Sequence, residues 1–89
     1  MKLVVTVVGK DRVGIIAMVS QILADNDVNI LSINQNIMDG FFNMVLIAEA
    51  DGSKVKLVDL QKTLKERGQE INVDIKAQHE DIFNVTHNI

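Results

Sequence analysis

Hydrophobic and polar positions follow two different periods along the chain, and the changes between them mark the predicted elements. Residues 2–8 are almost entirely apolar and rich in β-branched side chains, which predicts a buried central strand. From Ile15 the apolar positions recur every three to four residues and predict an amphipathic helix that ends near Asn26. Residues 29–39 then place apolar and polar side chains on opposite faces, which predicts a second strand.

The second half of the chain repeats the order strand, helix, strand. An Asp-Gly pair at 39–40 suits a tight hairpin turn, and residues 41–50 return as a strand that is apolar on both faces. Leucines with helical spacing from Leu57 predict a second helix, for which Gly68 would supply a left-handed C-terminal cap. Residues 70–78 alternate without interruption and predict the last strand.

The resulting β-α-β-β-α-β order predicts an α+β fold, the ferredoxin-like plait, with a four-stranded antiparallel sheet and two helices on one face. Its two central strands would be apolar on both faces, so the face without helices needs a cover. A short C-terminal tail with an apolar side could supply it, and so could a partner subunit. We therefore expect one domain at residues 1–78 and a tail at residues 79–89 that packs on the domain or on a partner subunit.

Composition removes several function classes. The chain has 89 residues, no cysteine, no tyrosine, no tryptophan and a net charge of -3. The lack of cysteine excludes a disulfide framework, a thiolate metal site and a thiol nucleophile. The acidic balance and the few aromatics argue against direct nucleic-acid binding. No segment is long and apolar enough for a membrane span or a signal-peptide core, so we expect a cytoplasmic protein without a membrane partner.

Catalytic chemistry is sparse in this sequence. It contains no triad arrangement, Walker loop or pair of carboxylates at catalytic spacing, so we expect neither an enzyme nor a cofactor. His79, Glu80, Asp81 and His87 are the one cluster of metal-ligating types. The wide spacing of the two histidines favours a polar tail segment over a metal site, and no metal is predicted.

The polar segment GKDRVG, residues 9–14, joins the first strand to the first helix. Asp11 is placed to be the N-cap of that helix, with its carboxylate accepting from amides of the first turn. The same turn leaves amides pointing outward at a helix N-terminus, where Gly14 leaves room for a carboxylate or a phosphate. Lys10 and Arg12 would add positive charge. Both interpretations, a structural cap and an anion-binding loop, stay open.

Residues 7–33, VVGKDRVGIIAMVSQILADNDVNILSI, resemble the start of ACT domains. In these domains the first loop and helix commonly run D-R-x-G-I/L, and the second strand opens with N-I. The matching motif positions here are Asp11, Gly14, Asn29 and Ile30. The order of elements and the length also agree over the whole chain. In detail the chain looks most like small stand-alone ACT proteins akin to the modules of the glycine cleavage system repressor.

The resemblance implies a regulatory, non-catalytic module that binds a small molecule, usually an amino acid, between two subunits of a side-by-side homodimer. Carried onto this sequence, it places Lys10, Asp11, Arg12, Val13 and Gly14 of one subunit opposite Asn29, Ile30 and Leu31 of its partner. Ligand binding would change the contacts of the dimer with a client protein. Many ACT domains carry proline where this chain has Val13, and without it the turn is less preorganised.

A second interpretation makes the chain a ligand-free protein-interaction adaptor or oligomerisation module. In that case GKDRVG is only a helix cap, and the Asn29 amide bonds to its local backbone.

Overall fold

The structure, a computed structural model, describes residues 1–10 and 14–82. It contains β1 (Lys2–Lys10), α1 (Ile15–Asp25), β2 (Asn29–Met38), β3 (Phe41–Glu49), α2 (Leu57–Gln69) and β4 (Val73–His79), and one helical turn at residues 80–82 follows β4. The predicted order of elements is confirmed. The last strand is shorter than predicted at its start, because residues 70–72 form the turn after α2 and β4 begins only at Val73.

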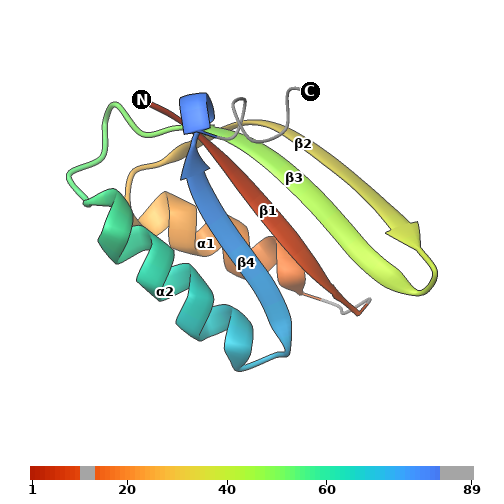
Figure 1. Cartoon of the computed structure of the whole chain (residues 1–89). Coiled ribbons are helices and arrows are strands. Elements are labelled where there is room, and N and C mark those ends of the chain that lie inside the picture. Colours follow the sequence, from red (N-terminus) through yellow and green to blue (C-terminus); the bar gives the residue numbers. More distant parts are fainter. Residues whose placement is uncertain (11–13, 83–89) are drawn as a thin grey trace.

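The four strands form one sheet in the order β2-β3-β1-β4, with every neighbouring pair antiparallel. The two strands that are apolar on both faces, β1 and β3, are central, as predicted. Both helices lie on one face of the sheet, beneath β1 and β4, while β2 is at the far edge (Figure 1). The ferredoxin-like plait is therefore confirmed.

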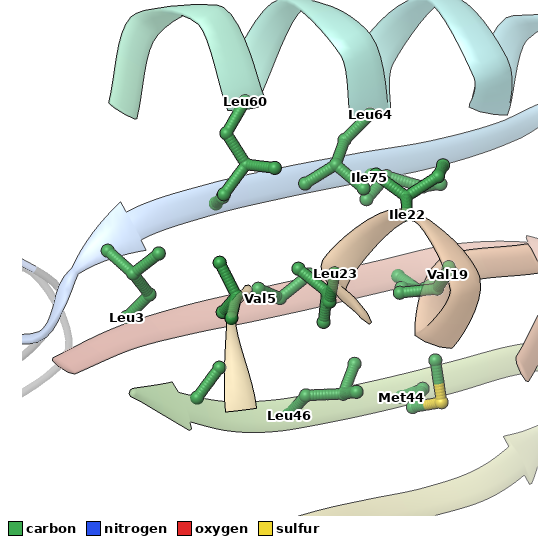
Figure 2. Packing of buried hydrophobic residues seen from close by; sticks show 14 of the residues in the cluster. Leu3, Val5, Val19, Ile22, Leu23, Met44, Leu46, Leu60, Leu64 and Ile75 are labelled. Carbon is green, nitrogen blue, oxygen red and sulfur yellow. The ribbon is translucent and has the colours of Figure 1, made fainter. Parts of the chain in front are cut away.

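The core lies between the inner face of the sheet and the two helices. Alternate residues of each of the three strands β1, β3 and β4 point into it, since neighbouring side chains on a strand face opposite ways. Leu60 and Leu64 reach down from α2 toward β4 and β1, and Leu23 of α1 packs over the same face (Figure 2). All three leucines are almost fully buried, so the chain has one small continuous core.

The hairpin turn between β2 and β3 is confirmed, because Asp39 and Gly40 both have positive φ angles of 53° and 82°. The predicted role of Gly68 is wrong. Gly68 lies within α2 without a positive φ, and a Cβ there would be 2.5 Å from the carbonyl oxygen of Val73. Glycine is thus needed for the close approach of α2 to β4, and the left-handed residue that leads into β4 is Asn72, with φ 58°.

The expected N-cap role of Asp11 is also wrong. The N-cap position of α1 is Gly14, with φ 92° and no side-chain cap, because the helix begins only at Ile15. Asp11 itself lies outside the described residues, as do Arg12 and Val13.

The face of the sheet opposite the helices, here called the open face, is covered only in part. Val4 is 2% exposed there, whereas Val8 is 43% exposed on the same strand. The prediction that a tail covers this face falls largely on residues 83–89, which lie outside the described residues. A partly exposed apolar face remains next to the end of β1.

Candidate functional site

The described residues of the predicted ligand site lie at opposite ends of the sheet. Lys10 ends β1 and pairs with Phe41, at the end where the chain turns toward α1. Asn29 begins β2 and pairs with Glu49, at the other end. The eleven-residue helix α1 connects the two ends and has a length of about 16 Å. Within one chain, Lys10 and Gly14 are therefore not brought together with the predicted site residues of β2, and the other predicted residues, 11–13, lie outside the described part of the chain.

The N-terminus of α1 has open space beside it. Gly14 is exposed, and a Cβ on it would meet no atom of residues 1–10 or 14–82 within 4 Å. Its carbonyl oxygen accepts from the amide of Met18 at 2.9 Å, which forms the first turn of the helix. This turn contains no acidic side chain, and no side chain of the described residues caps it. Among the described residues no side chain accepts from the first amides of α1, and amides at a helix N-terminus can donate to an anion.

The β2 edge of the sheet is exposed along nearly its whole length. Ile33 and Ile37 pair with Leu46 and Phe42, which point toward the helices, yet they are 40% and 59% exposed. Neither α1 nor α2 extends over the end of β2 that leads into the hairpin turn (Figure 1). Of the predicted site residues on this strand, Asn29 and Leu31 are exposed and Ile30 is half-buried against the core. A register shift between Ile30 and Ser32 leaves Leu31 without a partner in β3.

The opposite edge of the sheet, β4, is covered on one face by α2 and contacted by a side chain of that helix, and it is here called the closed edge. Val73, Ile75 and Ala77 are buried beneath α2. The side-chain amide of Gln61 on α2 donates to the carbonyl oxygen of Ala77 at 2.7 Å. Part of the β4 backbone is thereby satisfied by a side chain of the same subunit.

A hollow of about 450 Å³ lies on the open face at the end of β1. It is lined by Val8, Gly9, Lys10, Phe41, Asn72 and Asp74. Lys10 was predicted as a site residue, but its side chain follows Val8 on the open face and so points away from α1. Asn72 and Asp74 were missed. The pairing of Val8 with Asp74 brings them here, and that register is not visible in either segment alone.

The acidic and histidine side chains form no metal-binding group of three or more within residues 1–10 and 14–82. The Nδ1 atom of His79 accepts from the amide of Asp81 at 3.1 Å, a local turn contact, and His87 lies outside the described residues.

At the far end of β3, the N-terminal ammonium group donates to Glu49 at 2.8 Å. This hydrogen bond holds the pKa of Glu49 below its ordinary value despite some desolvation. No described helix is long and apolar enough to cross a membrane.

Comparisons with known proteins agree with this architecture. The ACT domain family profile matches residues 1–78. A UPF0237 protein from Clostridium perfringens is 49% identical over 89 residues, which cover all of both chains. An ACT domain protein from Streptococcus pneumoniae, of solved structure, is 38% identical with a TM-score of 0.83 and coverage of 93% of each chain.

A solved protein described as a glycine cleavage system transcriptional repressor shares the fold, with a TM-score of 0.76 at 19% identity. The match covers 86% of this chain and 45% of that protein. ACT domains are in general regulatory modules that bind small molecules such as amino acids and often dimerise. The profile match and the close relatives confirm the resemblance seen in the sequence, and this chain belongs to the ACT domain family.

Proposed function

We propose that this chain is a non-catalytic regulatory module that works in the cytoplasm and binds an amino acid across the interface of a homodimer. The observation that carries the proposal is the exposed β2 edge, with its uncovered Ile33 and Ile37. An edge strand presents unpaired backbone groups, and a second copy of the same strand can pair with them around a twofold axis.

Antiparallel pairing of two β2 strands would also assemble the predicted site. Met38 at the end of β2 pairs with Phe41, which in turn pairs with Lys10, so Met38 lies at the end of the sheet that leads to Gly14. In an antiparallel pair, the start of one β2 lies beside the end of the other. Asn29 of one subunit would therefore approach the α1 N-terminus of its partner.

The two halves of such a site complement a free amino acid. The first amides of α1, beside Gly14, would donate hydrogen bonds to the carboxylate, because the helix N-terminus carries partial positive charge. The side-chain oxygen of Asn29, or a nearby backbone carbonyl, would accept from the ammonium group. Since the ligand would touch both subunits, its binding would stabilise one dimer arrangement and change the surface offered to a client protein.

Thermal unfolding in the presence of each of the twenty amino acids tests this proposal. A ligand at about 100 times its Kd should add about 2.7 kcal/mol of stability, or several degrees in Tm. Gly14→Val should abolish that rise, because valine is strained at φ 92° and would fill the open space at the helix N-terminus.

Gly40→Val is the matched control. Gly40 also has positive φ and open space around it, but it lies in the hairpin turn. It should lower the Tm of the free protein in the same way as Gly14→Val and leave the rise caused by the ligand intact. A rise that persists in Gly14→Val would remove the loop from the site. No rise with any amino acid, together with a client protein captured directly, would instead support the ligand-free adaptor.

A further inference from the structure

We propose that the hollow on the open face is a second binding site and that it takes an amino acid with an apolar side chain. The hollow lies within one subunit and uses residues of β1, β3 and the start of β4. It does not use the β2 edge, so it goes beyond the proposed interface site and can exist without it.

The floor of the hollow is apolar and accessible. Val8 is 43% exposed and Phe41 is 48% exposed, although both belong to central strands. Lys10 pairs with Phe41 and Val8 pairs with Asn43, so Val8 and Phe41 are diagonal neighbours on one face. Such neighbours are about 7–8 Å apart, within reach of large side chains. Together they offer a surface on which an apolar side chain can pack.

Charges of opposite sign flank this floor. Asp74 pairs with Val8 across β1 and β4, and Lys10 is two residues further along β1 on the same face. Lys10 and Asp74 are therefore also diagonal neighbours. A bound amino acid would place its carboxylate at Lys10 and its ammonium group at Asp74.

Neither the Lys10 ammonium group nor the Asp74 carboxylate forms a strong ion pair with another described residue. No described carboxylate lies within ion-pairing distance of Lys10, while Asp74 has a contact of 3.7 Å with Lys76. That pair is mostly exposed, and exposed pairs of this kind contribute little. The carboxylate of Asp74 can therefore also accept from a ligand.

The size of the hollow and the pair of charges among its described lining residues indicate the class of ligand. A volume of about 450 Å³ is in the lower part of the usual range for small-molecule sites. One cation and one anion beside an apolar floor match a zwitterion with an apolar side chain. Among the described residues that line the hollow, Lys10 is the one cation, which favours a zwitterion over a polyanion.

Amide NMR spectra of the full chain, titrated with L-leucine and with L-phenylalanine, test the site directly. We expect the amides of Val8 and Asp74 to shift in a saturable manner. Two analogues of leucine separate the two charges: 4-methylpentanoate lacks the ammonium group and 3-methylbutylamine lacks the carboxylate. Because each analogue lacks one charge-assisted hydrogen bond that leucine would make, each analogue should bind at least about tenfold more weakly than leucine.

Asp74→Asn should weaken the binding of L-leucine about tenfold, since it removes the charge that faces the ammonium group. The matched control is Asp59→Asn, an exposed carboxylate on α2 outside the hollow, which should leave the affinity unchanged. Equal affinity of Asp74→Asn and the unmodified chain would overturn the proposal, provided that both give the dispersed spectrum of a folded protein.

The same spectra distinguish failure of this site from failure of the proposed interface site. Shifts at Gly14 and Asn29 with none at Val8 and Asp74 would overturn the second site and support the interface. Shifts at Val8 and Asp74 alone would support the second site and count against the interface. If neither probe moves Val8 or Asp74 at millimolar concentration, the hollow is not an amino-acid site.

Discussion

The two edge strands of the sheet, β4 and β2, differ in how far other parts of the same chain cover them. At β4, the residues Val73, Ile75 and Ala77 are buried beneath α2, and the side chain of Gln61 donates a hydrogen bond to a backbone carbonyl of the strand. At β2, Ile33 and Ile37 stay exposed on the side of the sheet that carries the helices. One edge is closed by its own subunit, and the other is left open.

This difference indicates where a partner can bind. Proteins commonly protect edge strands with charges, bulges or covering elements, because an open edge pairs readily with another chain. The β4 edge has such protection in Gln61 and in the charged pair of Asp74 and Lys76. The β2 edge has a bulge at Leu31 but no charged side chain between Asn29 and Met38. We therefore expect self-association through β2 and not through β4.

The largest expected effect is on the closed side. Leu64→Ala removes a fully buried side chain that joins α2 to the sheet, so it should lower the free energy of unfolding by about 2–5 kcal/mol. Ile37→Ala, the matched change at the open edge, should cost a monomer much less because that side chain is already 59% exposed. Urea unfolding of both variants at low protein concentration measures the contrast. Equal losses would mean that the two sides do not differ in this way.

A charge on the open edge should break association without harming the fold. Ile33→Lys would bring two ammonium groups together in the proposed β2 pairing, which should weaken it about a hundredfold, or about 3 kcal/mol. Sedimentation of a dilution series measures this. Val58→Lys is the control, because Val58 is exposed on α2, the helix that packs on β4 and not on β2. Unchanged association of Ile33→Lys, or equal loss in Val58→Lys, would contradict pairing through β2.

Opening the closed edge should have a smaller effect. Gln61→Ala leaves the Ala77 carbonyl without its partner on α2, so it should lower the free energy of unfolding by about 1 kcal/mol. Gln21→Ala is the control, since that amide bonds Asp25 on an exposed helix surface. Urea unfolding gives both values. If Gln61→Ala costs no more than Gln21→Ala, the contact is not what protects the β4 edge.

Much of this architecture could be predicted from the sequence because it depends on local patterns. The spacing of apolar residues gave the start of α1 at Ile15, and the Asp-Gly pair at 39–40 gave the hairpin. The role of Gly68 could not be predicted. A side chain at position 68 would clash with the backbone of Val73, and Val73 reaches α2 only because the chain turns back after the helix.

The candidate site divides in the same way. Gly14 and Asn29 could be proposed from the family resemblance, because each lies in a short motif of consecutive residues. The neighbourhood of Lys10 and Asp74 depends on the register between β1 and β4, strands separated by most of the chain. The exposure of Ile33 could not be predicted either, because alternation predicts a buried face without saying whether a helix will reach it.

The smallest predicted effect concerns the end of the sheet where β2 begins. Glu49 pairs with Asn29 and accepts from the N-terminal ammonium group, and this hydrogen bond is the main reason that its pKa lies below the ordinary 4.5. A carboxyl with a lowered pKa stabilises the folded state above its unfolded pKa and loses that contribution as the pH falls through its folded value.

Glu49→Gln should therefore reduce stability slightly at pH 7 and hardly at all once the pH is well below 4.5, so its cost should shrink on acidification. Thermal unfolding at a series of pH values from 7 to 3 measures this difference. Glu66→Gln serves as the control, because Glu66 is an exposed partner of Lys62 at 3.9 Å on α2. A cost of Glu49→Gln that stays constant with pH would mean that the ionised carboxylate does not tie the N-terminus to the start of the open edge.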